Sequence, residues 1–331
     1  MCASGGRRPD VLSAVDTAIG GRAGVALGSE GGAYSRRGER MFLVPPISGC
    51  LWRYGSIIVM QTVVALRRYP LKSARGEVLK AADVEPTGLR GDRTWACIDS
   101  LDGTVGSAKH PRRWGRLLDV GTTMRDDGPE TMLTLHVNGT SLRAGSAAAD
   151  AALSKHLGRP VRLSRELPPD ARLHRTLPDE VGMVPDWMGG ARPGQETITA
   201  IAGAGRVGRF VDFGAVHIVT TGALSLLGER MGGGSVAAQR FRPNLVIDAP
   251  RDPEPGQELR LGDVVLRVVL PTPRCVIPGL SQAELPADLA VLSALARHYR
   301  IPVAELGRAA CFGTYADVVQ PGRLGLGQLV R

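Results

Sequence analysis

The chain has little lysine, few aromatic residues and no long apolar run, and each shortage excludes a class of protein. Its net charge of +9 comes almost entirely from arginines that are scattered rather than gathered in one basic run, so it does not indicate nucleic-acid binding. Aromatic residues make up 4% of the chain, too few for the stacking platforms of single-strand binders. No apolar run approaches the roughly 18 residues of a membrane span. We therefore expect neither a nucleic-acid nor a membrane partner, while an anionic ligand stays open. The only lysines are Lys72, Lys80, Lys109 and Lys155.

The five cysteines show no CxxC pair and no zinc-finger spacing with histidine, which argues against structural zinc and iron–sulfur clusters. Their odd number and the lack of a signal-peptide pattern predict a reducing, cytoplasmic location. Cys97 and Cys311 are interpreted as packing residues.

Glycine is abundant, and one glycine cluster resembles a dinucleotide-binding motif. Residues 203–208 read Gly-Ala-Gly-Arg-Val-Gly, after a possible strand at 196–202. No helix pattern follows, and no acidic residue ends a second strand about 20 positions later. A nicotinamide-dependent enzyme is therefore the weakest functional alternative.

Short strands dominate the predicted structure, which indicates a mainly β or α+β fold with a few helices. Residues 1–59 lack periodicity and predict a disordered extension or a wrongly assigned start, with Met60 as the true start. We expect two domains, 60–168 and 169–331, with 168–195 as a long surface loop at their boundary. The predicted strands are 61–69, 93–99, 131–137, 140–143, 161–167, 215–219, 244–248, 263–270, 310–319 and 325–330, and the predicted helices are 146–157, 222–231 and 287–299.

A thiol next to a fixed cation is the most informative local feature. Cys275 follows the strand-like run 263–270 and lies between Pro273 and Pro278, which stiffen the segment. Arg274 is a positive neighbour that favours the thiolate form of Cys275. A thiolate acts as a nucleophile or as a soft metal ligand. The plainer interpretation is one more buried cysteine.

Polar or cationic residues also gather where other predicted strands end, and each group has a plain alternative. Asp92 can orient a neighbouring guanidinium and leave Arg93 to bind an anion, or the two can form a weak surface ion pair. His110 is interpreted as a surface-loop residue and His217 as a satisfied core histidine. The remaining groups are Lys72-Ser73 in a turn, Thr220-Thr221 at a helix start, and Arg240 to Asn244 at a strand entrance.

Taken together, these segments resemble the MOSC superfamily, the C-terminal domain type of molybdenum cofactor sulfurases. The resemblance is closest to the branch with an N-terminal β-barrel domain, which includes the mitochondrial amidoxime-reducing component. It implies an N-terminal β-barrel-like domain and a C-terminal MOSC β-barrel domain with a few helices. It covers 60–331 apart from the weakly matching 165–210, and the segments that carry it are 64–73, 88–93, 216–220, 241–246, 274–275 and 312–315.

The resemblance implies a molybdenum cofactor, a pterin (molybdopterin) whose sulfurs hold the metal. Cys275 matches the cysteine that ligates molybdenum and is the candidate catalytic residue. Ala223 and Pro273 depart from the family pattern, which puts two cofactor hydrogen bonds in doubt. The residues that match cofactor-binding positions are Lys72, Ser73, Arg93, Thr220, Arg242, Asn244 and Tyr315.

The function that the resemblance implies is the reduction of small N-hydroxylated compounds, such as amidoximes or hydroxylamines. The chain shows no second cysteine cluster after Cys311, so electrons would have to come from separate electron-transfer proteins. The alternative is a non-catalytic carrier of sulfur, as a persulfide on Cys275, or of the cofactor itself.

Overall fold

The structure is a computed structural model that describes residues 61–126, 131–201, 207–234 and 236–331. The expectation for residues 1–59 lies outside the described residues. So do positions 203–206 of the glycine cluster.

Nine strands form the largest sheet, which joins the first described strand to the last one. β1 pairs antiparallel with β13 and with β19, and β12 runs parallel to β13. The predicted segments 60–168 and 169–331 thus share this sheet, and their division into two domains stays a prediction. The strands are β1 (Gln61–Arg68), β2 (Glu77–Val78), β12 (Val216–Thr220), β13 (Leu245–Asp248), β14 (Glu258–Leu261), β15 (Val264–Pro273), β16 (Arg300–Pro302), β17 (Arg308–Gln320) and β19 (Leu329–Val330).

Four smaller sheets complete the strand pairing. β18 (Gly322–Gly325) joins β3 (Ala81–Glu85) and β4 (Gly88–Leu89), so the end of the chain again pairs with its beginning. The others are β6 (Gly121–Arg125) with β7 (Met132–Val137) and β8 (Thr140–Arg143), β5 (Ala96–Asp99) with β9 (Val161–Ser164), and β10 (Arg172–Thr176) with β11 (Glu196–Ala200).

The helix α3 (Ala147–Leu157) begins and ends where the chain supplies caps. The Ser146 hydroxyl accepts a hydrogen bond from the Ala149 amide at the start of α3, and Gly158 ends α3 in the left-handed conformation, at φ 68°. The helices are α2 (Pro111–Trp114), α3 (Ala147–Leu157), α5 (Thr221–Arg230) and α6 (Ala290–His298). Short 3₁₀ turns cover Gly115–Asp119, Val181–Met183, Asp186–Met188, Ala238–Phe241, Ile277–Gly279 and Ala304–Leu306.

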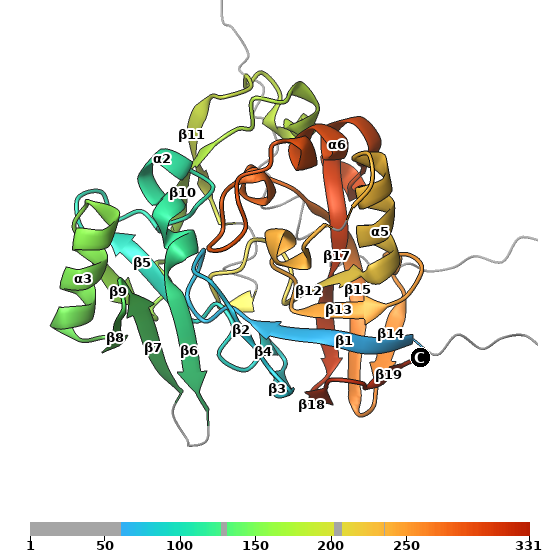
Figure 1. Ribbon diagram of the computed structural model, residues 1–331, viewed down its shortest axis with the longest axis horizontal. Coiled ribbons are helices and arrows are strands. Elements are labelled where there is room, and N and C mark those ends of the chain that lie inside the picture. Colours follow the sequence, from blue (N-terminus) through green and yellow to red (C-terminus); the bar gives the residue numbers. More distant parts are fainter. Residues whose placement is uncertain (1–60, 127–130, 202–206, 235) are drawn as a thin grey trace, which may run out of the picture.

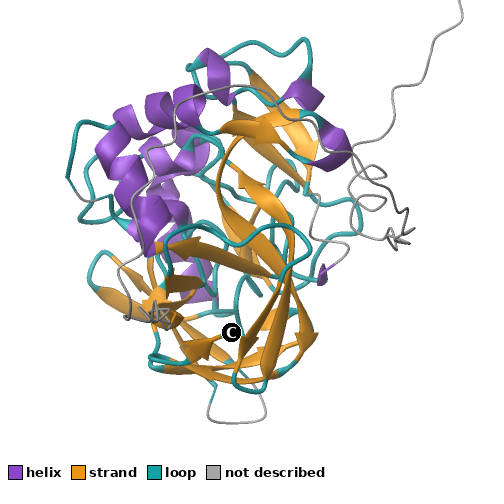
Figure 2. Cartoon of the chain, turned by 90° about the vertical axis from the view of Figure 1, so that its right-hand side faces the viewer, coloured by secondary structure: helices purple, strands orange, loops and turns teal. Residues whose placement is uncertain are grey.

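The molecule has two main bodies of packing (Figure 1). The sheet β6–β8 and α3 lie on one side, and β12–β17 lie on the other with α5 and α6 against them. Figure 2 shows most of the helices gathered on one side of the strands. None of the helices in the described part of the chain is both long and apolar enough to cross a membrane. The predicted mainly β, α+β fold with few helices is confirmed.

The prediction of a long surface loop over 168–195 is wrong. Residues 172–176 form β10, which pairs along its whole length with β11, and Leu173, Leu177 and Met183 are buried. Two 3₁₀ turns follow β10. This segment therefore forms part of the packed structure, and it reaches the cavity described below.

Candidate functional site

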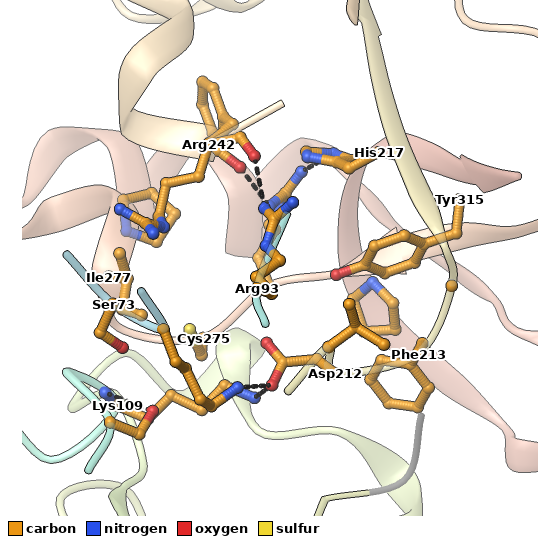
Figure 3. A pocket seen from close by; sticks show the side chains of 18 of the residues that line it. Ser73, Arg93, Lys109, Asp212, Phe213, His217, Arg242, Cys275, Ile277 and Tyr315 are labelled. Carbon is orange, nitrogen blue, oxygen red and sulfur yellow. Dashed lines mark hydrogen bonds and ion pairs between the residues drawn. The ribbon is translucent and has the colours of Figure 1, made fainter. Parts of the chain in front are cut away.

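One cavity brings together seven of the eight residues that match metal- or cofactor-binding positions in the resemblance (Figure 3). We call it the cationic cavity. The seven are Lys72, Ser73, Arg93, Arg242, Asn244, Cys275 and Tyr315, and the wall also includes Ser107, Lys109, Arg175, Pro185, Trp187, Phe210, Asp212, Phe213, His217, Arg240, Phe241 and Arg274.

Positive charge dominates the wall of this cavity. Seven lining residues are cations and one, Asp212, is a carboxylate. A pocket with such an excess attracts anions, and guanidinium groups bind carboxylate and phosphate oxygens through paired hydrogen bonds. The cavity is thus suited to an anionic ligand. Its cations are Lys72, Arg93, Lys109, Arg175, Arg240, Arg242 and Arg274.

Two of the four lysines of the chain share the carboxylate of Asp212. The Nζ atoms of Lys72 and Lys109 lie 3.0 and 2.8 Å from Asp212 Oδ1, and Lys72 also donates to the Phe210 carbonyl. Burial lowers the pKa of Lys72 to about 8, against the opposing effect of Asp212. Burial alone would raise the pKa of Asp212, but Lys109 and Lys72 hold it well below its usual range. Asp212 is therefore ionised beside the two ammonium groups.

Arg93 is held in place by three oxygen acceptors. Its guanidinium donates to Asp92 Oδ2, to Asn244 Oδ1 at 3.0 Å and to the Arg242 carbonyl at 3.0 Å. Asp92 therefore pairs with Arg93 itself, in a largely buried ion pair rather than a surface one, and anion binding by Arg93 stays a prediction. Both polar atoms of Asn244 bond to the chain itself, because Oδ1 also accepts from the His217 amide and Nδ2 donates to the Arg67 carbonyl.

Arg242 and Ser73 adopt left-handed backbone conformations at the cavity wall, with φ of 55° and 64°. The Arg242 guanidinium lies 4.4 Å from the centre of the Tyr69 ring and donates to the Ala74 carbonyl at 2.7 Å. Burial lowers the pKa of Arg242 to about 10, so the group stays charged near neutral pH. The Ser73 hydroxyl accepts from the Ala108 amide at 3.0 Å and ties this turn to the loop that carries Lys109.

Cys275 directly follows Arg274, whose guanidinium makes several hydrogen bonds. Arg274 Nε donates to the Phe312 carbonyl at 2.8 Å, and Nη1 donates to the Phe241 carbonyl at 3.1 Å. Burial and the positive charge of Arg274 lower the pKa of His217 well below its usual range, so its neutral Nε2 accepts from Arg274 Nη2. These contacts fix the loop that presents Cys275 to the cavity.

Gly313 on β17 is closely packed against the same region, so we expect its substitution to lower the stability of the fold. Gly313 has φ 74°, and an added Cβ would lie 2.6 Å from the Ile218 carbonyl oxygen and 2.7 Å from His217 Nε2. Gly139 has φ 78°, but no described atom lies within 4 Å of an added Cβ there. We expect Gly313→Ala to lower the free energy of unfolding by about 3 kcal/mol or more, and Gly139→Ala by about 1 kcal/mol. Urea unfolding measures both, and equal losses would contradict the close packing of Gly313.

Of the two remaining predicted site residues, Tyr315 lines the cationic cavity and Thr220 does not. Burial, and secondarily Asp212, raise the pKa of Tyr315, so its phenol keeps its proton. Thr220 stands apart from the cationic cavity. It caps α5 by accepting from the Ala223 amide, and its hydroxyl donates to Asp252 at 2.9 Å.

Two histidines differ from their interpretation in the sequence analysis, and several cavity residues were not singled out there. His217 is buried as expected, but it lines the cavity and contacts Arg274. His110 is 3% exposed and its Nε2 lies 3.2 Å from Glu196, so its placement on a surface loop was wrong. Lys109 could have been found from the rarity of lysine in the chain. No local pattern pointed to Asp212, Phe213, Arg175 or Trp187.

Comparison with known proteins gives matches over most of the chain. The MOSC N-terminal beta barrel domain matches residues 60–161, and the MOSC domain matches residues 206–331. The chain matches no curated protein significantly.

Two solved structures illustrate the likeness. The YuaD protein of Bacillus subtilis is 12% identical, with a TM-score of 0.39, over 82% of this chain and 94% of that one. YiiM from Geobacillus stearothermophilus is 18% identical, with a TM-score of 0.27, over 35% of this chain and 53% of that one. The matches to the two domain models together span more than half of the sequence. The chain therefore belongs to the MOSC family, with a MOSC N-terminal beta barrel domain ahead of its MOSC domain.

Proposed function

We propose that the chain binds a molybdenum cofactor in the cationic cavity, with Cys275 as the thiolate ligand of the metal. One observation carries the proposal. Segments that lie up to 243 residues apart in sequence, from Lys72 to Tyr315, meet so that Cys275 shares one cavity with seven cations and a single carboxylate. A soft thiolate suits molybdenum, and the cations suit a phosphate-bearing pterin.

The chemistry of the donor set fits such a group. Lys72, Arg93 and Arg242 carry the charge that would bind the phosphate, and Ser73 adds a hydroxyl beside them. Asn244 matches a cofactor-binding position, but both of its polar atoms bond to the chain. It would act on the cofactor by positioning Arg93. Thr220, outside the cavity, would support the site through Asp252.

We further propose that the protein reduces small N-hydroxylated compounds. The overall reaction takes a substrate N–OH group, two electrons and two protons, and yields N–H and water. The bound cofactor would supply the two-electron chemistry. Tyr315 keeps its phenolic proton, so it can donate a hydrogen bond to the hydroxyl oxygen of the substrate. The electrons would come from a separate electron-transfer protein.

Turnover with an artificial donor tests this function. The full chain, produced in a host that makes the cofactor, is mixed without oxygen with reduced methyl viologen and benzamidoxime. The expected result is oxidation of two viologen radicals for each benzamidine formed. Molybdenum-loaded protein that forms no benzamidine, and no reduced product from hydroxylamines, would contradict the reductase and favour a carrier of sulfur or cofactor.

A further inference from the structure

The cavity wall includes residues from a part of the chain that neither MOSC domain model matches. Residues 162–205 lie between the two matched ranges. Within them, β10 brings Arg175 to the cavity, and the turns after β10 bring Pro185 and Trp187. This part of the wall therefore lies outside the residues that the two domain models match.

Arg175 differs from the other cations of the cavity in its bonding. The other six each have at least one carbonyl or carboxylate oxygen as a partner. Among the described residues, the guanidinium of Arg175 bonds to no oxygen atom. Its Nη1 lies 4.0 Å from the sulfur of Met188, and its Nε is buried without a partner. Its Nη2 has no hydrogen-bond partner among the described residues either, so a ligand in the cavity that accepts from this guanidinium gains binding energy.

Aromatic side chains also line the cavity, and one of them, Trp187, comes from a turn after β10. Trp187, Phe213 and Tyr315 pack in one apolar cluster, and the rings of Phe213 and Tyr315 are 6.2 Å apart. Figure 3 shows Phe213 and Tyr315 across the cavity from Arg242 and Ser73, with Cys275 between the two groups. Five of the 14 aromatic residues of the chain line this one cavity. Such a wall favours a flat ring.

We propose that Arg175 binds an anionic group of the substrate, and that Trp187 and Phe213 contact a flat ring that links this group to the reacting N–OH. The inference rests on the proposed function, because it assigns the substrate class of that same site. We assign a carboxylate as this group, because a carboxylate accepts charge-assisted hydrogen bonds from a guanidinium. The substrate is thus an aromatic N-hydroxylated compound that carries a carboxylate.

A pair of substrates tests the assignment by turnover. We compare 4-carboxybenzamidoxime with its uncharged methyl ester in the parent, in Arg175→Gln and in Arg172→Gln. Arg172 lies on the same strand, is exposed and does not line the cavity. We expect the parent to prefer the carboxylate in kcat/KM by roughly tenfold or more, Arg172→Gln to keep this preference, and Arg175→Gln to lose it.

Binding without turnover separates this inference from the proposed function. Calorimetry of the carboxylate and the ester, with no electron donor present, should show the same preference and the same loss in Arg175→Gln. If the parent reduces neither compound but Arg175→Gln still abolishes the binding preference, the reductase fails and the anion site stands. An unchanged preference in Arg175→Gln would overturn the assignment. So would loss of molybdenum from Arg175→Gln, since Arg175 would then belong to the cofactor.

Discussion

Cys275→Ala is expected to lower N-hydroxy turnover by roughly 100-fold or more, because even indirect supports of a metal ligand are worth 10- to 100-fold. Of the described cysteines, Cys275 alone lines the cationic cavity. Burial raises the pKa values of Cys97 and Cys311 to about 12, so neither supplies a thiolate in its place. Anaerobic turnover of benzamidoxime with reduced methyl viologen measures the loss.

The matched control is Cys97→Ala, which removes a fully buried thiol from the core around α3. It should lose some stability and keep a turnover close to that of the parent. Near-ultraviolet circular dichroism should show that Cys275→Ala stays folded. A folded Cys275→Ala protein with more than half of the parental turnover would refute the role of this thiol.

The largest expected loss of stability follows from Asp92→Ala. Asp92 is 1% exposed, accepts from the Tyr69 amide at 2.7 Å and pairs with Arg93. Without it, a largely buried guanidinium loses its counter-charge and the Tyr69 amide loses its acceptor. Removing one partner of a buried ion pair costs about 3–5 kcal/mol, and we expect that decrease in the free energy of urea unfolding.

Asp83→Ala is the control for this effect. Asp83 pairs with Arg323 at 2.8 Å, but the two side chains are 41% and 70% exposed, so the loss should stay below about 1 kcal/mol. If Asp92→Ala does not fold, Asp92→Asn keeps an acceptor for the Tyr69 amide and should show an intermediate loss. Equal losses for Asp92→Asn and Asp83→Ala would contradict the account of Arg93.

Local signals were sufficient to predict much of the fold. The Asn138-Gly139 pair is a hairpin signal between the predicted strands 131–137 and 140–143, and both residues have the positive φ that this turn needs. Ser146 and Gly158 marked both ends of α3. Such features depend on neighbouring residues, so they can be read from a single sequence.

The prediction of a loop over residues 168–195 was wrong because the structure of this segment depends on a tertiary contact rather than on neighbouring residues. β10 carries two arginines and a histidine around one buried leucine, so it lacks the apolar alternation of a recognisable strand. Its pairing with β11 decides its structure, and that pairing is a tertiary contact.

The site shows the same division between local and tertiary signals. Cys275, Lys72 and Arg93 stood in recognisable short motifs. Asp212 is 140 positions from Lys72 and meets it only after folding. Arg175 lies in the strand that the sequence analysis missed.

The most direct test of the account is the molybdenum content of the full chain, purified without oxygen from a host shown to make the cofactor, beside Cys275→Ala and Cys97→Ala. We predict about one molybdenum per chain in the parent and in Cys97→Ala, and little or weakly held metal in Cys275→Ala. A metal-free parent, or equal molybdenum in Cys275→Ala, would contradict the claim that Cys275 holds a molybdenum cofactor in the cationic cavity.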